Sequence, residues 1–114
     1  MRQTPLKKIS KKRQKELKKY SALCTELQFL CGNRSELSGD KPDWQSNYLI
    51  EPHHIDGRQG KKLLNPFNVI MLVRNEHTAI ENEKPINGHK YTKEKLLSIV
   101  REIRIKQGFS EGGK

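Results

Sequence analysis

Apolar side chains recur at steps of three and four residues in the first third of the chain. This spacing places them on one face of a helix. Ser10 is a suitable N-cap before the helix, and Gly32 is a suitable residue to end it. The pattern therefore predicts an amphipathic helix whose first half is almost wholly basic. Its apolar positions are Leu17, Tyr20, Cys24, Leu27 and Cys31.

Residues 32–47 break this pattern, because they are polar and rich in Gly, Pro, Ser and Asp. Such a composition predicts a loop, and this loop carries Trp44. The apolar residues that follow predict a short strand from Tyr48 to Ile55. Pro52 lies within this strand, which favours an edge position or a bulge. Residues 56–60 then form a turn.

A second apolar run, from Val69 to Val73, predicts a strand that returns antiparallel to the first. Asn75 is the expected cap of a short helix that contains His77, Ile80 and Glu81. Asn87 and Gly88 predict another turn, and Thr92 is the expected cap of a final helix. The buried stripe of that helix is expected at Leu96, Leu97, Val100 and Ile103, before Gly108.

This order of elements predicts one α+β domain, with a basic helix at the start and a packing helix at the end. Residues 1–19 are expected to form a basic arm, residues 20–108 the domain and residues 109–114 a flexible tail. With 114 residues, the chain is too short for a multidomain enzyme. It has no apolar run of the ~20 residues that a membrane span needs and no apolar segment typical of a signal peptide. A cytoplasmic location, in a bacterial or phage-infected cell, is expected.

Charge points to an acidic partner, because the net charge is +10 at pH 7. Residues 1–19 hold nine cations and one anion, so they contribute +8 of that excess. A clustered basic segment is typical of proteins that bind the phosphate backbone of DNA, although a solubilising tail has the same composition. The lysines expected to contact DNA are Lys8, Lys11, Lys12, Lys15, Lys18 and Lys19, together with Lys61 and Lys62.

The two cysteines, Cys24 and Cys31, lie seven residues apart. On one helix this separation is about 10 Å, which is too long for a disulfide. Neither cysteine has a partner at the Cys-x2-Cys spacing of a zinc site. Both are expected to be small apolar residues with free thiols.

Three of the four histidines, His53, His54 and His77, fall within the predicted strand-loop-strand-helix unit. Side chains alternate along a strand, so the adjacent His53 and His54 point to different sides and suit different tasks. Imidazole is a common ligand of divalent metals and a suitable general base near neutral pH. His89 lies beside a predicted turn and is expected to have no such role.

The segment Glu51-Pro52-His53-His54-Ile55, with Asn68 fourteen residues after His54 and His77 nine residues after Asn68, resembles the HNH endonuclease family. The stretch GKKLLNPFNVIMLVRNEHTAI is similar to that family's Asn-Pro-x-Asn strand and histidine-bearing helix. The resemblance covers about residues 48–82. It implies a small ββα-metal (His-Me finger) core and cleavage of DNA phosphodiester bonds. The basic start of the chain is similar to that of phage-encoded HNH proteins.

Carried over to this chain, the resemblance implies that His53 and His77 bind one divalent metal ion. Family members often have a further ligand one helical turn later, and Glu81 is the candidate here because it follows His77 by four residues. Glu51, on the same strand face as His53, would orient that ligand or a nearby water. This ligand set suits Mg²⁺, Mn²⁺, Ni²⁺ or Zn²⁺, and Mg²⁺ or Mn²⁺ is expected.

The resemblance also implies that His54 is the general base that activates water, and that Asn68 positions His54 by holding the loop backbone across the hairpin. Arg58, in the turn that follows, is a candidate clamp for a phosphate oxygen.

Many HNH relatives carry a structural zinc, but Gln28, Val73 and Glu76 stand where its cysteines would be expected. No structural zinc is therefore expected here. Packing among the following residues and the last helix is expected to replace it: Leu27, Leu30, Leu49, Ile70, Leu72 and Ile80.

Two other functions fit the same composition. One is a non-catalytic nucleic-acid-binding protein that keeps the ββα unit as a scaffold. The other is an RNA-binding or ribosome-associated protein, against which the chain has few aromatic residues to stack on bases.

Overall fold

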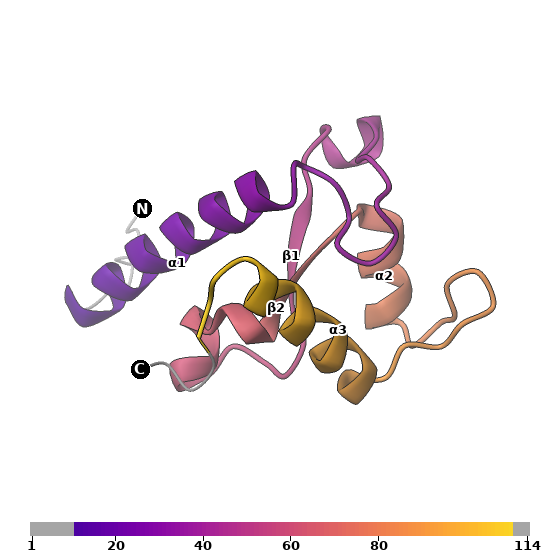
Figure 1. Cartoon of the computed structure of the whole chain (residues 1–114). Helices are drawn as coiled ribbons and strands as arrows, with labels where there is room; N and C mark the ends of the chain where they lie inside the picture. The colour runs from indigo at the N-terminus through magenta and orange to yellow at the C-terminus, as the bar shows by residue number, and fades with distance from the viewer. Residues whose placement is uncertain (1–10, 111–114) are drawn as a thin grey trace, which may run out of the picture.

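The computed structural model describes residues 11–110, which form a small mixed α/β domain with three helices and a two-stranded antiparallel sheet, compatible with the predicted α+β class (Figure 1). Three 3-10 turns, η1 to η3, lie in the connections. Ser10, Lys8 and the predicted C-terminal tail from residue 111 onward lie outside the described residues. The elements are α1 (Lys11–Leu30), η1 (Trp44–Ser46), β1 (Glu51–His54), η2 (Gly60–Leu64), η3 (Pro66–Asn68), β2 (Val69–Leu72), α2 (Arg74–Glu81) and α3 (Lys93–Lys106).

The sheet is a hairpin in which β1 pairs with β2, and it places both adjacent histidines on β1. His53 lies opposite Ile70 and His54 lies opposite Val69, while Pro52 pairs with Met71 at this two-stranded edge. β1 begins three residues later than the sequence predicted. Tyr48 has a φ of 59°, in the left-handed region, so the chain is still turning there and cannot continue as a strand.

β2 is buried along its whole length, because helices cover both faces of the hairpin. Val69 and Met71 pack with Leu27 of α1 on one face. Ile70 and Leu72 pack with Leu96 and Val100 of α3 on the other. Because side chains alternate along a strand, β2 contributes to both small core clusters, one on each face of the hairpin.

Two residues expected in the core are not there. Leu30 is 38% exposed and Leu49 is 54% exposed. Leu30 is the last residue of α1, beyond the turn that carries Leu27 into the core, and Leu49 follows the left-handed Tyr48 before β1 begins. Of α1, only Leu27 is fully buried, so the basic first half of this helix projects away from the core (Figure 1).

A buried ion pair joins α3 to the loop after α1. Arg104 is fully buried, and its guanidinium donates to both carboxylate oxygens of Glu36 at 2.5 and 2.6 Å. It also donates to the backbone carbonyls of Pro66 and Val69. Because a buried charge is stable only when it is paired and hydrogen-bonded, this network fixes α3 against the start of β2. Sequence periodicity predicted only apolar residues on this helix face.

The sequence predicted the turn and the helix cap before α3 correctly, but it did not predict the start of α2. Asn87 and Gly88 form the expected turn between Ile86 and His89, and the Thr92 side chain accepts a hydrogen bond from Lys95 N. Asn75 is not the cap of α2, because the helix begins at Arg74 directly after the extended Val73. No helix within residues 11–110 is long and apolar enough to cross a membrane.

Candidate metal and base site

Three possible metal-ligating side chains converge where β1 lies against α2. His53 comes from β1, whereas His77 and Glu81 lie one turn apart on α2. Each offers one ligand atom, and these atoms all lie within 4.8 Å of one another. The two imidazole rings meet edge to face with centroids 5.1 Å apart. Both histidines are partly buried and Glu81 is exposed, so the group opens to solvent on one side.

Glu51 orients one of these ligands from behind. Its Oε1 lies 3.0 Å from Nδ1 of His77, and its Oε2 accepts from Nε of Arg74 at 3.0 Å. Burial raises the pKa of Glu51, but the hydrogen bonds from His77 and Arg74 outweigh that effect and hold the pKa below its ordinary value. From the sequence, Glu51 was expected to orient His53 or a nearby water. The observed partner of Glu51 is His77, because α2 crosses the start of β1 and brings the His77 ring to the carboxylate.

The contacts of His77 suit a cation on its far side. Glu51 engages Nδ1 on one side of the ring, and Nε2 on the opposite side lies 3.4 Å from Oε1 of Glu81. In the tautomer that carries its proton on Nδ1, Nε2 presents a lone pair to a metal ion. Burial, and then the neighbouring His77, lower the pKa of His53, which keeps this ring neutral as a ligand must be. The donor set therefore fits a divalent metal ion.

His54 points to the other side of the hairpin, as strand alternation predicted. Its ring packs against Tyr20 of α1, with centroids 5.3 Å apart. The ring hydrogen-bonds the Leu63 backbone, while Nε2 is buried and has no hydrogen-bond partner among the described residues. Burial, and then the positive charge of Arg58, lower the pKa of His54, so the neutral form of the ring is favoured.

Asn68 holds the loop that follows His54. Its Oδ1 accepts from Asp56 N at 2.8 Å, and its Nδ2 donates to the carbonyls of Gly57 at 2.8 Å and Lys62 at 3.1 Å. The side chain is 3% exposed, so these bonds are shielded from water. Asn68 thus ties both ends of the loop 56–62 to the start of β2, which is the arrangement expected from the sequence.

The cationic residues near the site lie on different elements and make different contacts. The Arg58 guanidinium lies over the ring of Tyr20, 5.5 Å from its centroid, on the same side of the hairpin as His54. Lys62 pairs with Asp56 at 3.1 Å, and Lys61 is exposed on η2. Exposed lysines also line the first half of α1: Lys11, Lys12, Lys15, Lys18 and Lys19.

Two residues that contact the site were not identified from the sequence. Tyr20 was assigned only to the apolar stripe of its helix, and its contact with His54 depends on how α1 crosses the hairpin. Arg74 follows Leu72, the partner of Glu51, by two residues, so the hairpin register was the one available signal. Cys24 and Cys31 are free thiols, as predicted, and burial raises the pKa of both.

No protein-family model matches this chain, and neither the curated proteins nor the solved structures contain a significant match to it.

Proposed function

We propose that this protein is a metal-dependent endonuclease of the HNH type, which hydrolyses phosphodiester bonds of DNA. The observation that carries the proposal is the group of His53, His77 and Glu81, whose ligand atoms lie within 4.8 Å of one another. Further support comes from the neighbouring His54, whose Nε2 has no hydrogen-bond partner among the described residues. In this proposal β1, β2 and α2 are the ββα-metal unit.

Each residue has a distinct task in the proposed reaction. His53, His77 and Glu81 would hold a divalent ion, which would supply positive charge for the phosphate and the departing oxygen. His54, as neutral imidazole, accepts a proton from the attacking water through Nε2. Glu51 holds His77 in the tautomer that leaves Nε2 available. Since Nε2 of His54 is covered in the free protein, the side chains around it must part before water reaches it.

Two further residues act on the substrate side. Arg58 contacts a phosphate oxygen, and its planar guanidinium can do so with two parallel hydrogen bonds. Asn68 fixes the loop that carries Arg58 and that begins two residues after the base. The exposed lysines of α1 bind the DNA backbone outside the site, which makes the affinity fall steeply with salt.

Nicking of supercoiled plasmid DNA tests this proposal. His54→Ala should lower the rate at least about 10²-fold, because a positioned general base contributes about 10²–10⁴-fold. His89→Ala is the matched control, since His89 is an exposed histidine in the 87–88 turn region, and it should cleave at the unchanged rate. Chelation of divalent ions should stop cleavage in every variant. Equal cleavage by His54→Ala and the wild type would contradict the proposal.

The covered nitrogen of His54 also favours a second candidate, a DNA-binding protein without catalytic activity. In that case the metal group is structural or unused, and the basic helix accounts for the function. The two candidates separate in the same assay: this second one requires DNA binding by the wild type with no cleavage in Mg²⁺ or Mn²⁺.

A further inference from the structure

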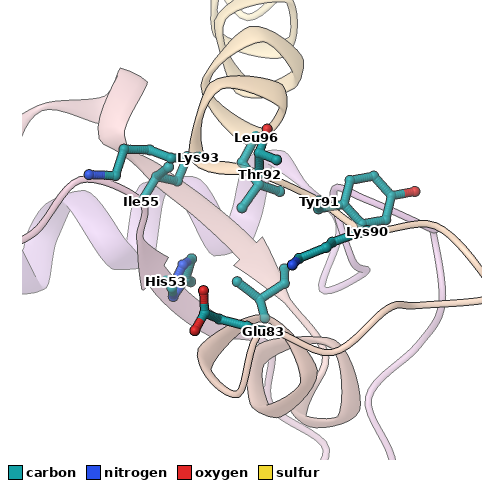
Figure 2. A pocket seen from close by; sticks show the side chains of 9 residues that line it. His53, Ile55, Glu83, Lys90, Tyr91, Thr92, Lys93 and Leu96 are labelled. Atoms are coloured by element: carbon teal, nitrogen blue, oxygen red, sulfur yellow. The ribbon is translucent and has the colours of Figure 1, made fainter.

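A cavity of about 390 Å³ opens directly beside the candidate metal group (Figure 2). His53 belongs to both, because its ring lies at the edge of the cavity as well as among the three ligands. The walls come from β1, from the end of α2, from the connection 90–92 and from the first turn of α3. This volume lies within the range of about 300–1,000 Å³ that is typical of small-ligand sites.

We infer that this cavity binds one nucleotide of the DNA strand that is cut, next to the scissile phosphate. The inference rests on the proposed function, because the strand reaches the cavity from the metal group through their common edge at His53. Ile55, Ile80 and Leu96 provide an apolar surface for the sugar or base. Lysines and one carboxylate lie among the other lining residues, so the cavity combines an apolar floor with polar groups that orient a ligand.

Lys90 is the phosphate ligand in this arrangement. Figure 2 shows its side chain reaching into the opening from the connection before α3. Among the described residues, no hydrogen bond or ion pair engages its ammonium group. Lys93, at the same rim, is paired with Asp56 at 2.8 Å and is therefore partly neutralised. Lys90 is thus the cation that is available for a phosphate oxygen.

Glu83 sets the orientation of the nucleotide. It is the acidic residue among those that line the cavity, and Figure 2 shows its carboxylate on the His53 side, away from Lys93. A carboxylate repels phosphate but accepts hydrogen bonds from the amino group of a base such as cytosine. The phosphate therefore lies on the lysine side, and the base edge or sugar hydroxyl lies on the Glu83 side.

Binding of a short duplex without metal tests this inference separately from cleavage. The probe is a fluorescein-labelled DNA duplex, and its anisotropy is followed over a series of salt concentrations in EDTA. Lys90→Ala should lower the slope of log K against log salt by about one, because one phosphate contact is lost. Lys106→Ala is the matched control: this exposed lysine lies at the other end of α3, and its loss should leave the slope unchanged.

A second readout places the effect in the cavity. The Ile80 methyl resonances should shift when the unlabelled duplex is added to the wild type, and the shift should shrink in Lys90→Ala. An unchanged slope in Lys90→Ala, or Ile80 methyl resonances that do not move on saturation with the duplex, would overturn the inference. If both effects are observed but the wild-type protein cuts no DNA, the nucleotide site stands and the nuclease proposal is refuted. Failure of this inference can therefore be distinguished from failure of the proposed function.

Discussion

Asn68 offers the sharpest test of how the loop after His54 is held. Asn68→Ala removes three hydrogen bonds, to Asp56 N, Gly57 O and Lys62 O, without changing the charge. At about 1 kcal/mol of net stability for each bond, the variant should lose about 3 kcal/mol of unfolding free energy. The side chain is 3% exposed, so water cannot fully replace the lost partners.

The matched control is Asn65→Ala, three residues earlier in the same connection. Asn65 is exposed and makes one bond, accepting from Phe67 N at 3.0 Å, so its loss should cost about 1 kcal/mol. Urea unfolding followed by circular dichroism separates the two variants. With a slope of about 2 kcal/mol/M, the extra 2 kcal/mol should lower the midpoint of Asn68→Ala by about 1 M more. Equal midpoints for the two variants would refute the role assigned to Asn68.

Three further predictions concern other contacts of the fold and the site. Glu51→Gln should weaken Mn²⁺ binding about tenfold in a calorimetric titration, because the carboxylate no longer supports His77; unchanged affinity would contradict this. Arg104→Met should cost about 3–5 kcal/mol in urea unfolding, since it leaves Glu36 buried and unpaired, and Glu36→Gln in the same chain should recover part of the loss. Burial, and then a hydrogen bond with Cys24, raise the pKa of Tyr20 to about 12, so the fold favours the protonated phenol. The stability from this group is complete below about pH 10 and is lost as the pH rises toward 12; the urea midpoint should therefore fall less between pH 9 and 11 in Tyr20→Phe than in the wild type, and equal falls would count against the contact.

Local signals in the sequence were sufficient for most of the elements. The uninterrupted apolar run at 69–73 predicted β2, and the Asn87-Gly88 pair and Thr92 predicted the turn and cap before α3. These features depend on backbone preferences within a few residues. The predicted start of β1 was wrong, because nothing in the local pattern shows that Tyr48 adopts a left-handed conformation.

Contacts between distant segments could not be read from periodicity. Arg104 and Glu36 are 68 residues apart, and their pairing depends on how α3 packs against the hairpin. Leu30 and Leu49 were expected in the core because they are apolar, yet both are exposed, since Leu30 is the last residue of α1 and Leu49 precedes β1. Hydrophobic patterning shows which face of an element is apolar, but not where the packed part of that element ends.

The sequence predicted only part of the candidate site, because some of its residues are neighbours on one helix whereas others meet only through packing. The spacing between His77 and Glu81 is one helical turn, so their proximity followed from the helix alone. Placing His53 beside them required the packing of α2 against β1. The family resemblance implied that His53 and His77 share one metal ion, and the structure brings their ligand atoms and that of Glu81 within 4.8 Å of one another. The packing of Tyr20 on His54 and the pairing of Glu51 with His77 arise from helix crossings that no local rule specifies.

The proposed metal site is tested most directly by the anomalous scattering of Mn²⁺ soaked into crystals of the wild-type protein and, in parallel, into crystals of His77→Ala. We expect one strong peak at bonding distance from His53, His77 and Glu81, and no peak there in the variant. A wild-type map without density among these three side chains, or a manganese ion bound elsewhere, would contradict the metal site and the hydrolytic function that depends on it.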